Sequence, residues 1–423
     1  MLKTIANAFS VAEIRKKLFF TAAILAIYRL GAFIPVPGVD VNAVKEIQDN
    51  FGGGDILGFL NTFSGGGLER LSLFALGIMP YITASIIFQM LGVVVPSIER
   101  LQKEGEVGQQ KITQYTRYLT VGLGAAQSFG YVFLFRSFGR QAGSEVLSSL
   151  SGAKLLMIVV SLTAGCTLLM WLGELITQRG IGNGISLLMF ASIVSGLPTG
   201  LRAWWTNPDQ IFVVMMPFIA LGVIVAIVFV QEGQRRIPVQ YAKRVVGRKM
   251  TSGGSTYLPL RVNMAGVIPV IFAATIMAMV PTIAQLLNTP AALDVAAFLG
   301  PNSWAYVVGE VFFIVVFTYF YTAITFNPVD QADNLKKYGG FIPGVRPGRP
   351  TAEYLDRILS RLTFPGALYL GAVAALPTIL INQTAANFAF GGTSILIVVG
   401  VALETVKQLE AQLMMRNYEG FLK

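Results

Sequence analysis

Histidine is absent from this chain of 423 residues, and Cys166 is its single cysteine. The lack of histidine excludes His-ligated metals, histidine proton relays and Ser-His catalysis. One cysteine cannot form a disulfide within the chain, so cysteine content says nothing about the redox compartment. No Walker A motif occurs either, so any ATP hydrolysis that drives this protein belongs to a partner.

Charge is also scarce. Only 13% of the residues are charged, whereas 54% are hydrophobic and the mean hydropathy is +0.64. Soluble domains carry about 25% charged residues, so this composition cannot cover a globule with polar surface. We therefore expect an integral membrane protein. Its net charge of +10 indicates either nucleic-acid binding or an asymmetric membrane topology, and the charge distribution favours the second.

Long uncharged stretches predict ten membrane-spanning helices. A span needs about 20 apolar residues, and the first such stretch, 18–39, is interrupted only by Arg29. We interpret it as a retained span and not as a signal peptide. The other charge-free runs are 71–98, 118–135, 155–173, 180–201, 210–231, 262–293, 311–329 and 362–403. The last run is twice the length of one span, so we expect it to fold back between residues 382 and 392.

The distribution of Lys and Arg predicts the orientation. With the N-terminus inside, most of the 32 Lys and Arg residues fall on the cytoplasmic side, in agreement with the positive-inside rule. We expect both termini to be cytoplasmic. Two cytoplasmic loops, 232–261 and 330–361, are long and basic. Topology and contact with anionic lipid are the simpler explanations, but loops of this length favour docking of a large water-soluble partner.

The expected fold class is an all-α integral membrane protein in two halves. Residues 1–205 hold spans 1–5 and residues 206–423 hold spans 6–10. Two halves of five spans start on opposite faces, as in an inverted repeat, although the halves show no convincing sequence identity. Between spans 1 and 2, residues 55–63 predict a short amphipathic helix followed by glycines. It is either re-entrant and faces a cavity or lies on the outer leaflet.

Seven motifs are long and unusual. They are LGIMPYITASII at 76–87, MWLGE at 170–174, RGIGNGIS at 179–186, VNMAGVIP at 262–269, ADNLKK at 332–337, GVRPG at 344–348 and GGTS at 391–394. These motifs resemble the SecY family, the central channel subunits of the bacterial Sec protein translocase. The resemblance runs from the N-terminus to Tyr418. It implies a non-enzymatic, protein-conducting channel in the cytoplasmic membrane, which translocates unfolded secretory polypeptides and releases membrane spans sideways into lipid.

The resemblance also implies the parts of a central pore. Its apolar ring would consist of Ile78, Ile82, Ile185, Met189, Ile271 and Ile397. Its plug, at about 55–64, would include Asp55, Ile56, Leu57, Phe59, Leu60, Phe63 and Ser64 with Gly65 and Gly66, and the glycines at 65–67 would form its hinge. An apolar ring excludes ions by dewetting. Taken alone, each isoleucine is more simply a packing residue, and Met189 replaces the isoleucine common in the family with a more adaptable side chain.

Two further sets of residues receive roles through the resemblance. Gln89, Gln127 and Asn263 lie in apolar stretches, where amides form hydrogen bonds between helices; the resemblance places them beside a lateral gate for signal sequences, and a static contact is the alternative. The predicted docking residues are Arg235, Arg236, Lys243, Arg244, Arg248, Lys249, Lys336, Lys337 and Arg346. The implied partners are the SecA motor ATPase, the ribosome through its RNA, nascent chains, membrane lipid, and the small subunits SecE and SecG.

A secondary transporter and an intramembrane enzyme are the alternatives to a channel. A secondary transporter would be expected to carry paired charges or broken helices at mid-membrane, and the middles of most spans lack charged residues. An intramembrane enzyme would need a catalytic or metal-binding constellation, and none is visible. We expect no catalytic residue, metal or cofactor. Glu310 and Glu404 are interpreted as interfacial, and Arg29 has no assigned partner.

Overall fold

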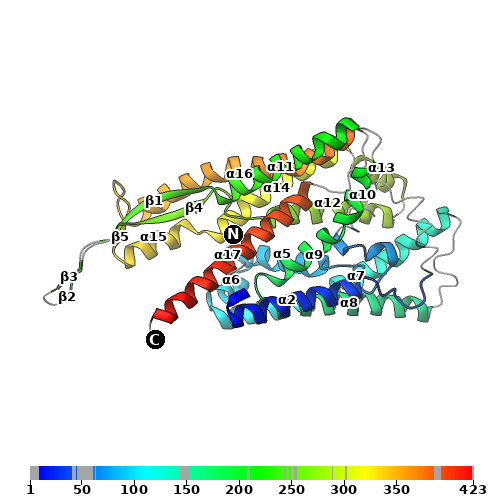
Figure 1. Cartoon of the computed structure of the whole chain (residues 1–423), viewed down its shortest axis with the longest axis horizontal. Helices are drawn as coiled ribbons and strands as arrows, with labels where there is room; N and C mark the ends of the chain where they lie inside the picture. The colour runs from blue at the N-terminus through cyan, green and yellow to red at the C-terminus, as the bar shows by residue number, and fades with distance from the viewer. Residues whose placement is uncertain are drawn as a thin grey trace.

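The computed structural model describes residues 9–40, 44, 61, 63–142, 152–206, 210–241, 244–246, 249–251, 255–287, 289–300, 303–384 and 392–421. These residues are mostly helical, and the long helices run along the longest axis of the molecule (Figure 1). The helical class predicted from the sequence is therefore confirmed.

A helix lies in each predicted span. These helices are α2 (Ala12–Gly31), α5 (Met79–Val94), α7 (Glu106–Ala142), α8 (Gly152–Arg179), α9 (Gly184–Ser195), α11 (Gln210–Glu232), α12 (Ile268–Leu287), α14 (Trp304–Thr325), α16 (Arg349–Thr384) and α17 (Gly392–Phe421). Among the described residues, six helices are long and apolar enough to cross a membrane, or seven if one bent pair counts as a span. The count of ten spans is consistent with this but stays a prediction. The predicted fold-back is confirmed, because α16 ends at Thr384 and α17 begins at Gly392.

Shorter elements connect the long helices. They are η1 (Leu68–Arg70), α6 (Pro96–Lys103), α10 (Leu197–Trp205), α13 (Pro290–Phe298) and α15 (Pro328–Lys337). Helices α5 and α6 form the bent pair, with an angle of 102° between them. Val95 between them is extended, and Pro96 follows it. A residue before proline is driven out of the helical region, so the break follows from the sequence.

The start of span 2 differs from the prediction. The charge-free run begins at Leu71, but α5 begins only at Met79, and the residues between them form turns. Leu71 and Gly77 have positive φ angles of 40° and 58°, which a helix does not tolerate. At Gly77 a Cβ would lie 3.0 Å from the Phe63 carbonyl oxygen. The irregular backbone thus lets the chain pass close to the segment that precedes it.

The two basic loops contain strands that the sequence analysis did not predict. β1 (Gln234–Tyr241) pairs antiparallel with β4 (Ser255–Arg261), so that Ile237 lies opposite Leu258. β1 also pairs with β5 (Gly340–Phe341), which gives a sheet in the order β4-β1-β5. β2 (Arg244–Val246) and β3 (Lys249–Thr251) form a separate pair. Burial alternates along β1, with Ile237 and Val239 inside, as expected for a strand with one covered face.

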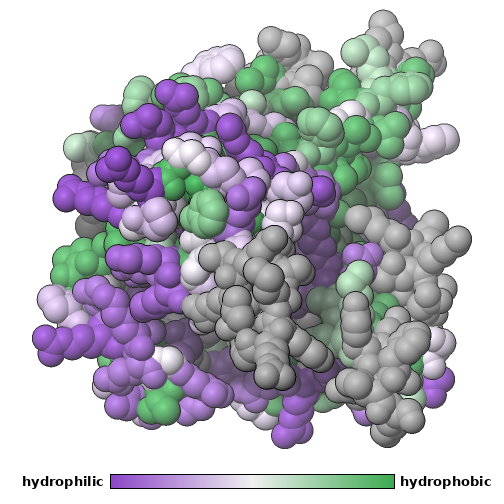
Figure 2. All heavy atoms as spheres, turned by 90° about the vertical axis from the view of Figure 1, so that its left-hand side faces the viewer, coloured by the Kyte–Doolittle hydropathy of each residue, from purple (hydrophilic) through white to green (hydrophobic). Residues whose placement is uncertain are grey.

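β1, β4, β5 and α15 form a single folded unit at one end of the molecule, which we call the basic unit. Its core joins Ile237 and Leu260 from the first loop with Ile342 from the second and Leu355 from the start of α16. Figure 2 looks onto this end, and hydrophilic side chains predominate among its coloured residues. The two basic loops therefore pack against each other and share one core.

The long helices fall into two groups (Figure 1). In one group, α7 packs on α5 and α8, and α8 packs on α2 and α9. In the other, α14 packs on α12 and α16. Helix α17 contacts α9 of the first group and α11 and α16 of the second, and α12 contacts α5 and α7. The largest hydrophobic core contains residues of both groups, so it lies where they meet. The predicted boundary between halves near residue 205 stays a prediction.

Candidate functional site

The six residues of the predicted ring all belong to this central core. Ile78 and Ile82 lie at the start of α5, Ile185 and Met189 on α9, Ile271 on α12, and Ile397 on α17. Five of the six side chains are buried, and Ile185 is half-buried. Four helices, two from each group, thus bring six apolar side chains into one cluster.

Glycines on α8 and α9 position the ring residues of the first group. A Cβ at Gly184, the first residue of α9, would lie 1.9 Å from the Gly173 carbonyl oxygen of α8. A Cβ at Gly173 would lie 3.3 Å from Ile185 and 3.6 Å from Ile78. Only glycines permit helices to approach so closely. The MWLGE and RGIGNGIS motifs therefore place α9 against α8, with Ile78 and Ile185 at the contact.

Contacts between the helix groups at this level are weak. The Thr275 hydroxyl on α12 lies 3.9 Å from the Met79 sulfur on α5, and it also donates to the Ile271 carbonyl, 2.7 Å away. A thioether is a weak acceptor. Among the described residues, the core around this contact consists mostly of aliphatic side chains, and such packing is non-directional. Such a seam holds by shape and can separate without leaving charged groups unpaired.

The predicted plug lies only partly within the described residues. Asp55, Ile56, Leu57, Phe59 and Leu60 lie outside them. Phe63 and Ser64 are described and buried, and Phe63 belongs to the same core as the ring. Gly65 and Gly66 follow with φ angles of 66° and 83°, which suit glycine.

Arg29 gains the partner that the sequence analysis could not assign. Its guanidinium donates to the Gly65 carbonyl over 2.5 Å and lies 4.8 Å from the centre of the Phe33 ring. Beside it, Tyr28 contacts both Ser64 and Ser192. Tyr28 and Ser192 were not predicted from the sequence, because neither belongs to a recognised pattern.

Two of the three amides of the predicted lateral gate form hydrogen bonds within their own segment. Gln89 donates to the Ser85 hydroxyl at 3.3 Å, and Asn263 donates to the Gly266 carbonyl at 2.8 Å. Gln127 is half-buried on α7. No hydrogen bond among the described residues joins the three amides, so their role at a gate stays a prediction.

Several predicted docking residues share the surface of the basic unit. Arg235 and Arg236 on β1, Lys336 and Lys337 on α15, and Arg346 before α16 are all exposed. The β1–β5 pairing and the packing of α15 on β5 bring the two loops together. The Arg346 carbonyl accepts a hydrogen bond from the buried Thr351 hydroxyl at 2.8 Å. Arg244 and Lys249 lie on β2 and β3, and Lys243 and Arg248 lie outside the described residues.

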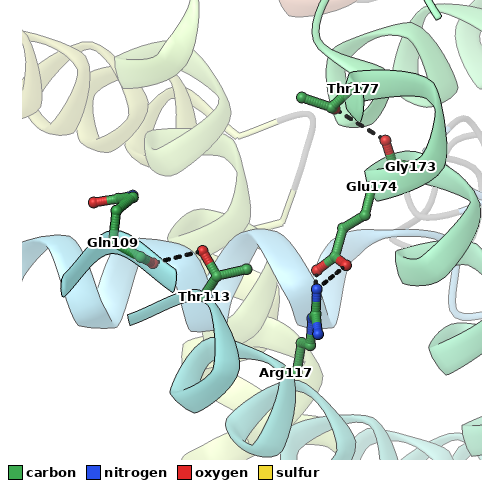
Figure 3. A network of polar contacts seen from close by, with 6 residues as sticks. All are labelled: Gln109, Thr113, Arg117, Gly173, Glu174 and Thr177. Atoms are coloured by element: carbon green, nitrogen blue, oxygen red, sulfur yellow. Dashed lines mark hydrogen bonds and ion pairs between the residues drawn. The ribbon is translucent and has the colours of Figure 1, made fainter. Parts of the chain in front are cut away.

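A bidentate ion pair joins α7 and α8 of the first helix group (Figure 3). Arg117 on α7 donates to both carboxylate oxygens of Glu174 on α8, over 2.8 and 2.5 Å. The Glu174 side chain is 11% exposed and that of Arg117 is 43% exposed. One turn later, Thr177 donates to the Gly173 carbonyl and accepts from the Gly184 amide. These contacts link α7 to α8 and the end of α8 to the first residue of α9, the helix on which Ile185 and Met189 lie.

Two acidic residues were interpreted as interfacial. Glu310 is 4% exposed and therefore buried within the protein, and its position at the membrane interface stays a prediction. Its surroundings on α14 are contacts with α12 and α16. Glu404 is exposed, and Lys407 pairs with Glu232 at 2.8 Å. Within the described residues, no group of three metal-ligating side chains occurs.

One charged pair lies outside the spans, on α6. Lys103 binds Glu99 at 2.6 Å. The hydrogen bond, and then the positive charge of Lys103, lower the pKa of Glu99 from its usual value, while Glu99 raises the pKa of Lys103. Both side chains are exposed, so solvent screens this pair.

Fold and site together define a class: a helical membrane protein in which two groups of helices meet at a large apolar core. A model of the SecY family matches residues 72–406. The chain is 50% identical to the protein translocase subunit SecY of Streptomyces galbus and 47% identical to that of Mycobacterium bovis, with 100% of each chain covered. The chain therefore belongs to the SecY family, whose members are channel subunits and not enzymes.

Solved structures show the same fold. A structure described as a protein-conducting channel matches with a TM-score of 0.62 and 19% identity over 93% of this chain and 91% of the other. A second concerns a SecY plug domain that stabilises the closed state of the translocation channel and maintains a membrane seal; its TM-score is 0.63, with 20% identity and the same coverage.

Proposed function

We propose that this chain is the protein-conducting channel of a translocase, through which unfolded polypeptides cross the bacterial cytoplasmic membrane. Its membership of the SecY family supports this, as do relatives named protein translocase subunit SecY. The observation that carries the proposal is that one core, shared by both helix groups, contains or packs against Ile78, Ile82, Ile185, Met189, Ile271 and Ile397.

The chemistry of these six side chains, which we call the collar, suits a pore for polypeptides. Side chains without hydrogen-bonding groups hold no water film, so a narrow collar excludes hydrated ions. They also offer a passing peptide no donor or acceptor that would hold it back. Because the collar joins the two helix groups mostly by aliphatic packing, opening separates α5 and α9 from α12 and α17 at modest cost.

The segment before α5 acts as the plug in this proposal. Phe63 reaches the central core, and two glycines with positive φ follow at 65 and 66. A neighbour in structure has a plug that maintains a membrane seal. We assign the same role to residues 55–66 here, with the glycines as the hinge.

The basic unit is the docking surface, on the cytoplasmic side together with both termini. Its exposed Arg and Lys side chains suit a motor ATPase such as SecA or the phosphates of ribosomal RNA. One structural neighbour is Sec61 in a ribosome–channel complex. The small subunits SecE and SecG complete the channel, and Gln89, Gln127 and Asn263 border the lateral gate that admits signal sequences to lipid.

The test is resting ion conductance of the full-length chain, purified with its co-purifying subunits and fused into planar bilayers. The double variant Ile78→Gly/Ile397→Gly should conduct small ions without substrate, since it removes two side chains of the collar. The matched control is Ile158→Gly/Ile358→Gly, which deletes buried isoleucines from two other cores. A resting conductance equal to that of the unaltered channel would remove the pore assignment.

A further inference from the structure

Two consecutive residues of α2 hold the end of the proposed plug by its backbone. The Tyr28 hydroxyl donates to the Ser64 carbonyl oxygen over 3.2 Å. The Arg29 guanidinium donates to the next carbonyl, that of Gly65, over 2.5 Å. Both acceptors are backbone carbonyl oxygens, so these two hydrogen bonds hold the backbone of the hinge in position.

The same tyrosine hydroxyl also contacts the helix that carries part of the ring. Tyr28 Oη lies 2.5 Å from Ser192 Oγ, on α9, one turn beyond Met189. Ser192 Oγ is also 2.9 Å from the Leu188 carbonyl oxygen. Tyr28 and Ser192 have one hydroxyl hydrogen each, yet three hydrogen bonds require them. When Tyr28 donates to Ser64, Ser192 must donate to Tyr28 instead of to Leu188. A hydroxyl that accepts a hydrogen bond is polarised and becomes a stronger donor, so the strength of the Tyr28–Ser64 bond depends on the position of Ser192 on α9.

We propose that Tyr28, Arg29 and Ser192 form a latch that keeps the plug hinge closed and releases it when α9 moves relative to α2. This hinge latch rests on the proposed channel function and extends it. Opening of the collar shifts Ile185 and Met189 together with Ser192, because all three lie on α9. The shift breaks the Tyr28–Ser192 contact and weakens the hold on Ser64. These are positioning residues, which act on the seal through the hinge.

The surroundings of the latch make its hydrogen bonds effective. Tyr28 and Ser64 are almost completely buried, so water cannot replace a lost donor at the Ser64 carbonyl. The Tyr28 ring stacks on Phe74, with 6.0 Å between centroids and 17° between planes. The ring therefore has packing of its own, and loss of the hydroxyl alone should leave it in place.

The two hinge glycines differ in their contact with the latch. A Cβ at Gly65 would lie 2.6 Å from Tyr28 Oη and 3.2 Å from Ser192 Cα. A Cβ at Gly66 would have nothing within 4 Å. Both residues have positive φ, so both need glycine for conformation, but only Gly65 lies against the latch. This difference indicates that the hinge is fitted to Tyr28 and Ser192.

The experiment compares Tyr28→Phe with a matched control, Tyr319→Phe. The Tyr319 hydroxyl donates to the Ser360 carbonyl over 3.3 Å, between α14 and α16. Both substitutions remove one hydroxyl that binds a backbone carbonyl. For each variant of the full-length channel, resting ion conductance in planar bilayers and the thermal unfolding midpoint are measured.

We expect Tyr28→Phe to raise resting conductance about fivefold, equivalent to about 1 kcal/mol, the usual net contribution of a hydrogen bond. Tyr319→Phe should leave conductance unchanged, even if its unfolding midpoint falls as much as that of Tyr28→Phe. Ser192→Ala should give a smaller rise, and the double variant Tyr28→Phe/Ser192→Ala should conduct no more than Tyr28→Phe, because both residues act through one hydroxyl.

Unchanged conductance in Tyr28→Phe would overturn the latch, and so would an equal rise in Tyr319→Phe, which would indicate general loosening. If Tyr28→Phe does not fold, unchanged conductance in Ser192→Ala overturns the latch in its place. If the Ile78→Gly/Ile397→Gly channel leaks while Tyr28→Phe does not, only the latch fails. If neither leaks, the channel function itself fails.

Discussion

The central collar and the basic unit are built in opposite ways. The collar gathers uncharged aliphatic side chains from four helices that lie far apart in the sequence. The basic unit buries a small core beneath a hydrogen-bonded sheet and displays Arg and Lys outward. Dispersion and shape hold the collar, so it can part and re-form. Directional backbone hydrogen bonds hold the basic unit, so its shape is fixed by the pairing of its strands.

The sharpest way to separate the two regions is to reverse one charge on the basic unit. Arg346→Glu should reduce export of a secretory reporter about tenfold or more, because it places an acidic group on a surface that attracts its partner by charge. Resting conductance should not change, since Arg346 is exposed and outside the central core.

Arg349→Glu is the matched control for that substitution. The Arg349 side chain is 91% exposed and pairs with Glu353 one turn later, at 3.3 Å. Export in Arg349→Glu should stay near the normal rate. Equal losses in both variants would mean that general surface charge matters and that Arg346 has no special place in docking.

A smaller effect is expected in the wall behind the collar. Glu174→Gln breaks the bidentate contact with Arg117 (Figure 3) and should lower the unfolding free energy by about 1–2 kcal/mol. A buried pair broken on one side costs about 3–5 kcal/mol, and the exposure of Arg117 to 43% reduces that figure.

Thermal or chemical unfolding in detergent measures this change. The double variant Arg117→Gln/Glu174→Gln should recover part of the loss, because no charge is then left without its partner. A double variant less stable than both single variants would show that the pair is not what couples α7 to α8.

The smallest effect is expected at the exposed pair on α6. Lys103 lowers the pKa of Glu99, so the contribution of Glu99 to stability is present above its unfolded pKa. It is lost as the pH falls through the lowered folded pKa. Because both side chains are exposed, we expect Glu99→Gln to leave the unfolding midpoint unchanged at pH 7 and at pH 3. A clear drop at pH 7 alone would show that this surface is shielded from solvent.

Features that depend on local pattern were predictable from the sequence. Uncharged runs located the long helices because burial in lipid requires them over about 20 residues. The break after Thr384 followed from length alone. The strand β1 was not predicted although Ile237 and Val239 lie two residues apart, since Pro238 between them and the basic residues around them favour a loop.

Features that depend on distant contacts were not predictable. The bond of Tyr28 to Ser192 joins residues 164 positions apart, and no periodicity announces it. The burial of Glu310 depends on how α12 and α16 pack around α14, which a position near the end of a span does not reveal. The six predicted ring residues belong to or pack against one core, but their assignment to a ring came from resemblance and stays a prediction, because an isoleucine in a helix carries no sign of the axis it faces.

Strand β1 bonds to β4 of its own loop on one edge and to β5 of the next loop on the other. β1 begins two residues after α11 ends at Glu232, and α16 begins at Arg349, a short distance after β5. A load applied anywhere on this sheet is consequently shared by two long helices of the same group. A motor protein bound to this sheet would hold both helices through one hydrogen-bonded element, and it could move their group away from the other helix group as a rigid body.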